Sequence, residues 1–289
     1  MNSRDLVELL RLPAALTVPG DSLAGAAHAG RSRSPRVWAM PVASALLYWG
    51  GMALNDWADR DVDAVERPER PVPSGRVTPE TALATGTALC LGGVLVSVAA
   101  GGRAAARVSV PLAALIWTYD GYAKSTFAGP AVMASTRGLD VLLGSAATPA
   151  RAWQPAAAVT AHTAAVTLLS RGEVHGTDAR TARAATTTTA AVAATTALVA
   201  LADRTAPVAH RVCAAVLAAG YGYVVSRAQA RTLREPGAAS VRTATGTGIR
   251  GLVILQSAWL ARRGALAQAA GVLAVGPALR AASKVVSPT

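Results

Sequence analysis

Charged side chains are scarce in this chain, and their scarcity argues against most classes of soluble protein. Only 15% of its 289 residues are Asp, Glu, Lys or Arg, whereas 52% are hydrophobic. Soluble globular proteins contain about 25% charged residues. The composition is instead typical of a protein that lies largely within a lipid bilayer.

Cysteine is also rare, and the chain lacks the polar–apolar alternation that marks β-strands. The two cysteines, Cys90 and Cys213, lie within apolar runs, so the sequence predicts neither a disulfide framework nor a cysteine-based metal site. A strand-free backbone satisfies its hydrogen bonds in lipid by forming helices. We therefore predict an all-α, multi-pass integral membrane protein with a single transmembrane domain over residues 1–289.

Apolar runs near the length of about 20 residues that crosses a bilayer recur along the chain. We expect helices at residues 13–29, 37–54, 79–100, 105–122, 130–149, 154–170, 185–202, 207–225 and 248–282. Arg262 and Arg263 interrupt the last run, which is either one broken helix or a short hairpin, so nine helices are expected and ten are possible. Asp5 and Glu8 precede the first run, and we therefore expect no cleavable signal peptide.

Lysine is limited to Lys124 and Lys284, so the formal charge of +12 comes almost entirely from arginine. Many arginines lie in the connections between apolar runs. This placement favours contact with anionic lipid of the cell membrane over binding of nucleic acid. Arginines after the second, sixth and eighth runs would place those connections in the cytoplasm, whereas Arg31, Arg33 and Arg36 argue for the opposite orientation.

The most informative charges come directly after the uncharged run Trp38 to Leu54. Asn55, Asp56, Asp59 and Asp63 follow there. On a continuous α-helix these four side chains fall within an arc of about 100°, and Asp61 points to the opposite side. The spacing therefore predicts one polar face at the end of an apolar helix.

Three carboxylates on one face would repel one another unless a cation lies between them. Mg²⁺ accepts oxygen ligands and commonly takes one or two carboxylates together with substrate phosphates. The pattern thus favours a magnesium site. The alternative is a solvated charged loop between two membrane helices.

Two other acidic residues lie in or near apolar runs, where ionisable groups are costly and usually functional. Asp120 is four residues before Lys124, and Asp140 is three residues after Arg137. Each spacing is also compatible with a simple ion pair along a helix. The sequence leaves both interpretations open.

The motif around Asn55 resembles the N-D-x-x-D-x-x-x-D motif of the UbiA superfamily of intramembrane prenyltransferases. The segment Arg70 to Gly75 reads R-P-V-P-S-G and is similar to the R-P-x-P-S-G that follows this motif in the family. Tyr119 and Lys124 resemble the family's Tyr and Lys at the end of the fourth helix. The resemblance implies nine helices around a central cavity, Mg²⁺ as cofactor and a polyprenyl diphosphate donor.

The chain departs from this family where a second Asp-rich motif is usual, after the sixth helix. It reads S-R-G-E-V-H-G-T-D from Ser170 to Asp178, and only Glu173 and Asp178 offer carboxylates there. This form, together with the segment Thr17 to Asp21, resembles the EboC-like branch of bacterial UbiA-type proteins. The departure puts a second metal site in doubt.

The resemblance implies a prenyltransferase that ionises an allylic diphosphate and passes the prenyl group to an acceptor that the sequence does not identify. The expected catalytic residues are Asp56, Asp59, Asp63, Lys124, Arg171 and Glu173. The expected substrate-binding residues are Asn55, Arg67, Arg70, Tyr119, Asp178 and Arg11, and the expected magnesium ligands are Asn55, Asp56, Asp59, Asp63 and Glu173. We expect the carboxyls of the first motif to open into one cavity with Lys124 and the segment Arg171 to Asp178.

Two further functions remain compatible with the sequence. A membrane transporter also places polar groups at helix breaks. A non-catalytic UbiA-like protein would bind a prenyl lipid for a partner enzyme, and only the altered second motif favours that interpretation.

Overall fold

The computed structural model describes residues 2–32, 34 and 38–282, and the regular structure in these ranges is entirely helical. The first part of the chain forms α1 (Ser3–Leu10), η1 (Leu12–Thr17), α2 (Pro19–His28), α3 (Ala39–Ala58) and α4 (Arg60–Glu66). The middle part forms α5 (Pro79–Gly121), η3 (Ala123–Ser125), α6 (Gly129–Gly144), η4 (Pro149–Ala152) and α7 (Trp153–Ser170). The last part forms α8 (Ala179–Ala202), α9 (Val208–Arg231), α10 (Ala238–Arg262) and α11 (Leu266–Ala282).

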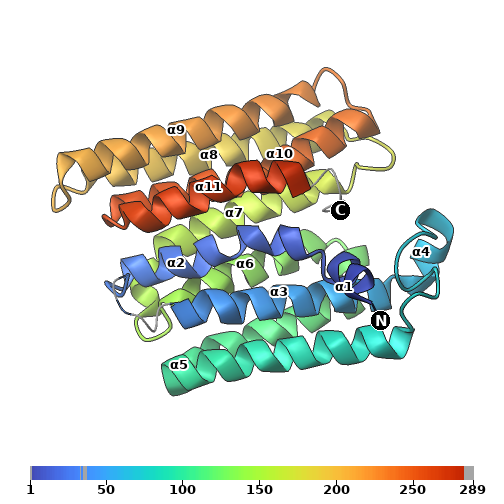
Figure 1. Cartoon of the computed structure of the whole chain (residues 1–289). Helices are drawn as coiled ribbons and strands as arrows, with labels where there is room; N and C mark the ends of the chain where they lie inside the picture. Colours follow the sequence, from blue (N-terminus) through green and yellow to red (C-terminus); the bar gives the residue numbers. More distant parts are fainter. Residues whose placement is uncertain (1, 33, 35–37, 283–289) are drawn as a thin grey trace.

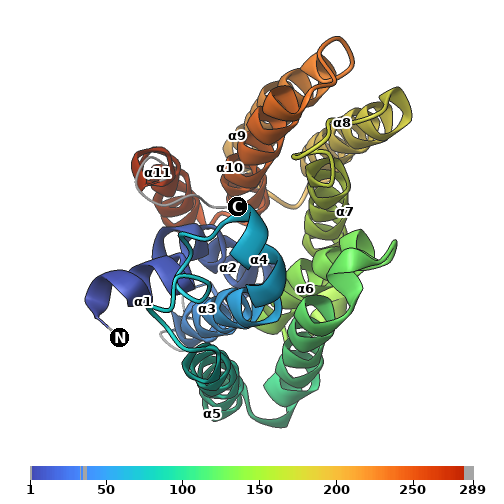
Figure 2. The same ribbon diagram turned by 90° about the vertical axis from the view of Figure 1, so that its right-hand side faces the viewer.

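The long helices run side by side in one bundle (Figure 1). Figure 2 views this bundle from one end, with α2 near its middle and α8 and α9 at its periphery. The central α2 packs against α3, α6 and α10. Among the described residues, α5, α8 and α9 are each long and apolar enough to cross a membrane.

The helices confirm the predicted fold class, and the backbone breaks at three places within or between the expected spans. The first run is broken into η1 and α2, because Pro19 lacks the N–H that a continuous helix would use. The runs 79–100 and 105–122 form two helices, as expected, which share the label α5 and meet at Gly102, where the backbone angles (φ 62°, ψ −150°) are ones that glycine adopts readily. The last run is the hairpin of α10 and α11, turned at Gly264 (φ 72°).

Small residues let α2 and α6 approach very closely. A Cβ atom placed on Gly144 would lie 1.8 Å from the carbonyl oxygen of Ser22, and one placed on Gly25 would lie 1.8 Å from that of Val141. Close contact of this kind is a common way to join helices in lipid. It fixes α2 and α6 relative to each other.

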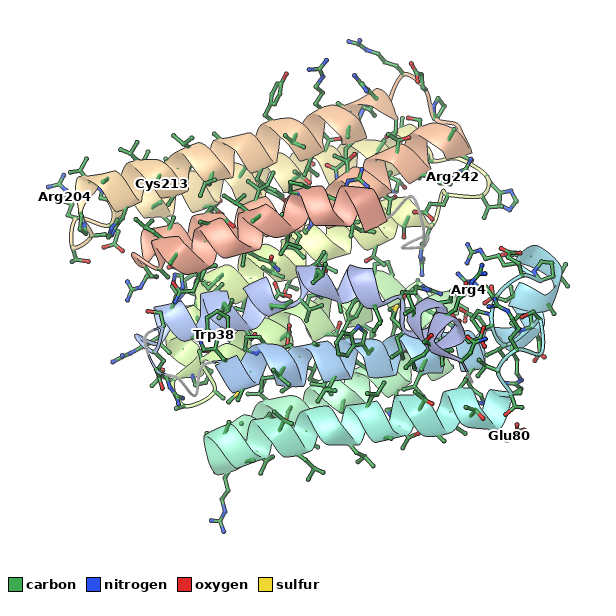
Figure 3. The ribbon with its side chains drawn as sticks, in the orientation of Figure 1. Arg4, Trp38, Glu80, Arg204, Cys213 and Arg242 are labelled. Atoms are coloured by element: carbon green, nitrogen blue, oxygen red, sulfur yellow. The ribbon has the colours of Figure 1, made fainter. Side chains whose placement is uncertain are left out.

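One end of the bundle carries most of the polar connections between helices. Figure 3 places Arg4, Glu80 and Arg242 at this end and Trp38 and Arg204 at the opposite end. The candidate site lies at the first of these ends.

Candidate active site

The first polar segment (residues 55–76) begins on α3, and the helix does not continue through it as the sequence suggested. It ends at Ala58, and Asp59 adopts non-helical angles (φ −88°, ψ 0°) before α4 starts at Arg60. The Asp59 N–H still donates to the carbonyl oxygen of Asn55 at 2.9 Å. The expectation of one continuous helix was therefore wrong. The angular spacing of side chains on an ideal helix does not reveal a break at a single residue.

Despite this break, Asp61 lies apart from Asp56 and Asp63, as the spacing predicted. Asp56 and Asp63 are buried, with exposed fractions of 1% and 2%. The side chain of Asp61 is 86% exposed and lies 3.7 Å from the guanidinium of Arg60. The short α4 turns Asp63 back toward Asp56, so the two carboxylates share one environment.

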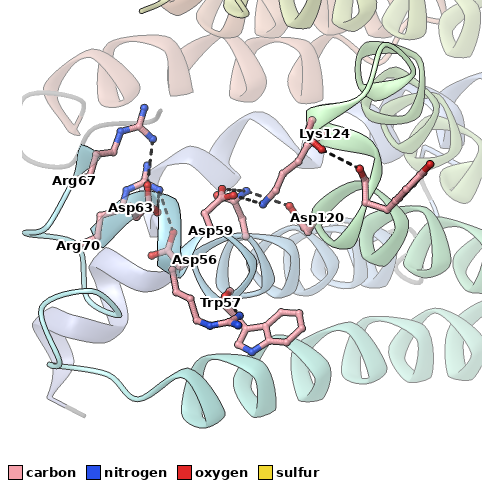
Figure 4. Close-up of polar contacts among 12 residues, drawn as sticks. Asp56, Trp57, Asp59, Asp63, Arg67, Arg70, Asp120 and Lys124 are labelled. Carbon is pink, nitrogen blue, oxygen red and sulfur yellow. Dashed lines mark hydrogen bonds and ion pairs between the residues drawn. The ribbon is translucent and has the colours of Figure 1, made fainter. Parts of the chain in front are cut away.

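Arginine side chains hold these two buried carboxylates together. Arg70 Nη1 lies 2.5 Å from Asp63 Oδ2 and 3.7 Å from Asp56 Oδ1. Arg67 Nη1 lies 3.9 Å from Asp63 Oδ1. Arg11 Nη2 completes the set at 2.9 Å from Asp56 Oδ1. Figure 4 shows Arg67 and Arg70 converging with Asp56 and Asp63.

A second set of contacts surrounds Asp59, near Lys124 and Asp120 (Figure 4). Lys124 Nζ lies 2.6 Å from Asp59 Oδ1. The Asn55 amide donates to Asp59 Oδ2 at 3.0 Å and to Asp120 Oδ1 at 3.2 Å. Lys124 therefore pairs with Asp59, where the sequence had offered Asp120 as its partner four residues earlier. Asp120 joins the first motif through Asn55.

The N-terminal helix α1 is fastened over the first polar segment. Arg76 Nη1 lies 2.8 Å from Asp5 Oδ1 and 2.7 Å from Glu8 Oε2. The hydrogen bond from Arg76 lowers the pKa of the Glu8 carboxyl below its ordinary value. Just after α1, Arg11 has a left-handed backbone (φ 45°), which is uncommon for a residue other than glycine. This anchored turn directs the Arg11 guanidinium to Asp56.

The second polar segment (residues 171–178) lies on the opposite side of the same end. Arg171 Nη2 donates to the carbonyl oxygen of Thr126, next to the turn that carries Lys124. Burial raises the pKa of the Glu173 carboxyl above its ordinary value, and the positive charges of Arg67 and Arg242 partly offset this rise. The positive charge of Arg67, which lies 3.9 Å from Asp63, therefore also acts on Glu173 in the second polar segment.

Asp178 is used differently from the other predicted site residues. Its Oδ1 accepts the backbone N–H groups of Arg180 and Thr181 at 2.8 and 2.9 Å. These bonds cap the N-terminus of α8 and lower the pKa of the Asp178 carboxyl. Both oxygens are engaged within their own turn, since Oδ2 accepts the Thr181 hydroxyl at 2.7 Å.

A cavity with about 820 Å³ of empty space, partly open to the outside, extends inward from the first motif. Its outer end is lined by Arg11, Asn55, Tyr119 and Asp120. The middle is apolar and is formed by Leu47, Tyr48, Gly51, Met52, Leu112, Ile116 and Met133. The carboxyls of Asp56, Asp59 and Asp63, Lys124 and the second polar segment are not in its lining. Asp56 adjoins its outer end through Arg11, and Asp59 with its partner Lys124 adjoins it through Asn55.

Comparison with known proteins accounts for this arrangement. The sequence matches the UbiA prenyltransferase family over residues 15–246. The chain belongs to the UbiA prenyltransferase family. One relative is the digeranylgeranylglyceryl phosphate synthase of Natronomonas pharaonis, 37% identical over 145 residues, which are 50% of this chain and 52% of the relative. The chain thus spans about half the length of the curated relatives it matches.

Solved structures of UbiA proteins share the fold over nearly the full chain. A UbiA homolog from Archaeoglobus fulgidus, bound to GPP and Mg²⁺, has a TM-score of 0.67 at 14% identity and covers 95% of this chain and 99% of its own. A structure concerned with digeranylgeranylglyceryl phosphate synthase in membranes has a TM-score of 0.65 at 16% identity and covers 91% of this chain and 98% of its own. At such identities the likeness shows the fold.

The first motif of this UbiA protein offers the ligand chemistry that Mg²⁺ requires. Its donors are the carboxylate and carboxamide oxygens of Asn55, Asp56, Asp59 and Asp63. Within the described residues, no group of three or more His, Cys, Asp or Glu side chains is arranged to hold a metal ion by itself. Since Mg²⁺ commonly completes its shell with substrate phosphates, the donor set fits an ion that binds together with a diphosphate.

The sequence did not identify a second polar cluster, at the inner end of the cavity. Arg137 pairs there with Asp21 at 2.8 Å and not with Asp140, the partner suggested by sequence spacing. Ser44 donates a hydrogen bond to Asp140. The only signal in the sequence was the presence of Asp140 and Arg137 within an apolar run, and it did not reveal Asp21 or Ser44 as partners.

Proposed function

We propose that this protein is an intramembrane prenyltransferase that moves a prenyl group from a prenyl diphosphate to an acceptor. The observation that carries the proposal is the junction of a charged cluster with an apolar cavity. Asp56, Asp59 and Asp63 lie at its outer end, each in contact with a cationic side chain. A prenyl diphosphate has the same division, with a charged head and an apolar tail.

The charged cluster can bind a diphosphate by exchanging partners. Arg11, Arg70 and Lys124 now contact carboxylates, and their guanidinium and ammonium groups are donors suited to phosphate oxygens. The released carboxylates of Asp56, Asp59 and Asp63, with Asn55, would hold Mg²⁺. When bound, Mg²⁺ neutralises negative charge on the diphosphate as the leaving oxygen develops charge.

The reaction breaks the bond between the allylic carbon and the diphosphate oxygen, and the electron pair leaves with the diphosphate. A nucleophilic oxygen of the acceptor forms the new bond to that carbon, and its proton passes to the released diphosphate. The apolar cavity wall keeps water from the allylic cation. Tyr119, in the outer lining, presents an aromatic ring that can stabilise a cation.

The acceptor is proposed to be a hydroxyl of a glyceryl phosphate that already bears one prenyl chain. The support is the name of several relatives, digeranylgeranylglyceryl phosphate synthase. Homologs of the same fold are bound to GPP or DMAPP together with Mg²⁺, which supports the donor class. We further propose a multi-pass location in the cell membrane, with the arginine-bearing outer end of the site toward the cytoplasm.

Purified protein in lipid nanodiscs, incubated with Mg²⁺, geranylgeranyl diphosphate and geranylgeranylglyceryl phosphate, should release diphosphate and form a doubly prenylated product. A chelator should abolish both signals, and added Mg²⁺ should restore them. Donor binding without product, for any acceptor, would favour the non-catalytic lipid-binding alternative. Absence of donor binding in the presence of Mg²⁺ would overturn the proposal.

A further inference from the structure

The outer end of the bundle carries a second hollow that the proposed reaction does not use. It is an open groove with about 880 Å³ of empty space between the last turns of α9 and the first turns of α10, and it shares no lining residue with the apolar cavity. Figure 3 places Arg242 of α10 at the same end. We call this hollow the α9–α10 groove. Its lining includes Val224, Arg227 and Arg231 of α9 and Ser240, Thr243 and Thr247 of α10.

One wall of the groove carries two arginines that no acid neutralises. Arg227 and Arg231 lie one turn apart on α9, a spacing at which like charges repel. Arg227 Nη1 donates to the Tyr223 hydroxyl at 2.7 Å, which leaves the charge of the guanidinium unpaired. Glu235 also lines the groove, yet within the described residues no carboxylate lies within 4.0 Å of either guanidinium. An anionic group bound between the two arginines would relieve their repulsion.

The other wall of the groove supplies hydroxyl groups. The hydroxyls of Thr243 and Thr247 donate to backbone carbonyls of their own helix at 2.9 and 2.8 Å. The hydroxyl of Ser240 has no hydrogen-bond partner among the described residues, so it can donate to a ligand. With two arginines and one glutamate, the lining has a net charge of +1. Guanidinium groups beside a hydroxyl donor suit a phosphate group, whose oxygens accept several hydrogen bonds.

The groove begins where the apolar surface of α9 ends. This helix is long and apolar enough to cross a membrane, and it lies at the periphery of the bundle (Figure 2). Val212 and Val216 on α9 are 48% and 64% exposed. At about 100° per residue, these two valines fall within one arc of about 100° together with Arg227 and Arg231. A ligand that binds the arginines through a phosphate can therefore extend apolar chains along the same face of α9.

We propose that the α9–α10 groove binds the headgroup of an anionic phospholipid from the surrounding bilayer; this inference rests on the proposed membrane location. The phosphate lies between Arg227 and Arg231, and the acyl chains follow the face of α9 that carries Val212 and Val216. A net charge of +1 complements a phosphodiester with one negative charge. In phosphatidylcholine, the arginines attract the phosphate but repel the choline cation. The groove therefore selects phosphatidylglycerol over phosphatidylcholine.

The test measures lipid binding to the purified protein in neutral detergent by native mass spectrometry, with phosphatidylglycerol or phosphatidylcholine added. The unaltered protein should bind one phosphatidylglycerol about tenfold more tightly than phosphatidylcholine, because the headgroup of phosphatidylglycerol carries no cation to oppose the two arginines. Arg227→Met combined with Arg231→Met should remove this preference.

The matched control is Arg234→Met. Arg234 is an exposed arginine three residues after Arg231, and it is not in the lining of the groove. Its substitution should preserve the preference for phosphatidylglycerol. Equal losses of preference in the control and in the double variant would show a general attraction of arginine to anionic lipid and would overturn the site.

Substitution of the groove acid should change binding in the opposite direction. Glu235→Gln raises the charge of the lining from +1 to +2, so it should strengthen phosphatidylglycerol binding about threefold or more. A folding defect would weaken binding and cannot imitate this gain. Melting temperatures of all variants are measured alongside. Unchanged or weaker binding by Glu235→Gln would exclude the proposed charge complementarity.

Soluble phosphates distinguish a lipid from a free phosphate ligand. Glycerol 1-phosphate and inorganic phosphate offer similar oxygens without acyl chains, and about a hundredfold excess of either should leave the lipid bound, because neither buries apolar surface on α9. Displacement of the lipid by either compound would assign the groove to a soluble phosphate and overturn the lipid assignment. If the protein does not insert into lipid nanodiscs, the proposed membrane location itself fails. If it inserts but binds both lipids equally, only the proposed role of the groove is wrong.

Discussion

The two polar segments at the outer end of the bundle occupy the same end but use their charges differently. In the first polar segment, buried Asp56 and Asp63 share Arg70, and Asp59 pairs with Lys124. In the second, Arg171 donates to a backbone carbonyl, and Asp178 caps a helix. The first segment thus contains paired opposite charges, which a diphosphate and a cation can separate on binding. In the second segment, Arg171 and Asp178 mostly stabilise local structure, and Glu173 is a half-buried carboxyl.

This difference suggests how the chain functions with an altered second motif. Mg²⁺ commonly takes one or two carboxylates together with phosphate oxygens, and the first polar segment offers Asp56, Asp59 and Asp63 for this role. Arg67 pairs with Asp63, and its charge also acts on Glu173. We propose that this charge performs part of the neutralisation that a second metal would otherwise supply.

The largest effect is expected for substitution of Asp59, which is compared with substitution of Asp61 in the same polar segment. Asp59→Asn should lower turnover about a hundredfold, the order seen when one preorganised electrostatic contact is removed, because it removes a carboxylate that adjoins Lys124 and Asn55. Asp61→Asn should stay within about twofold, since its side chain is 86% exposed. Steady-state diphosphate release measures both, and equal losses would contradict the assignment of the two faces.

A smaller effect is expected at Arg70, which bridges Asp56 and Asp63. Arg70→Met leaves two buried carboxylates without this shared cation, so donor affinity should fall at least tenfold and the melting temperature should drop. Breaking a buried ion pair costs about 3–5 kcal/mol, and the opening of this site to solvent favours the lower value. Arg60→Met, which removes only an exposed pair with Asp61, is the control and should change neither quantity. An Arg70 variant with unchanged donor affinity would exclude the proposed exchange of partners.

The sequence predicted the helices well, because apolar runs depend on local order. Apolar runs reveal spans directly, and the spacing of Asp56 and Asp61 predicted that these two carboxylates lie on opposite sides, in agreement with the burial of Asp56 and the exposure of Asp61. The break at Asp59 escaped prediction because one non-helical residue leaves no compositional trace. By contrast, the break at Gly102 was predicted, because it lies between the apolar runs 79–100 and 105–122.

The inner cluster could not be predicted because its contacts are tertiary. Arg137 has an acidic neighbour three residues away, yet it pairs with Asp21 of the broken first span. Gln256 and the carbonyl of Thr17 are 239 residues apart. Such pairings depend on how α2 sits between α6 and α10, which a single sequence does not specify.

The second polar segment should show a weaker effect on turnover than the first. We expect Arg171→Met and Glu173→Gln each to lower turnover about tenfold or less while donor affinity changes little, as for a contact that strengthens in the transition state. Arg180→Met, an exposed change on the neighbouring helix, is the control. Turnover and binding are measured separately on each variant. Normal turnover in both Arg171 and Glu173 variants would make this segment purely structural.

The smallest effect is expected at Asp178. Variants of this residue test whether its carboxyl caps α8 or contacts the substrate. Hydrogen bonds from Thr181 and Arg180 lower the pKa of this carboxyl, so its ionised form stabilises the folded state above the unfolded pKa of about 4. That stabilisation is lost as the pH falls through the lowered folded value. Asp178→Ala should therefore reduce the melting temperature by a few degrees at pH 7, and the difference should shrink near pH 3. Asp178→Ser retains a capping oxygen but no charge. If Asp178→Ser keeps both melting temperature and turnover at pH 7, Asp178 acts as a cap; if it keeps the melting temperature but loses turnover, the carboxylate contacts the substrate.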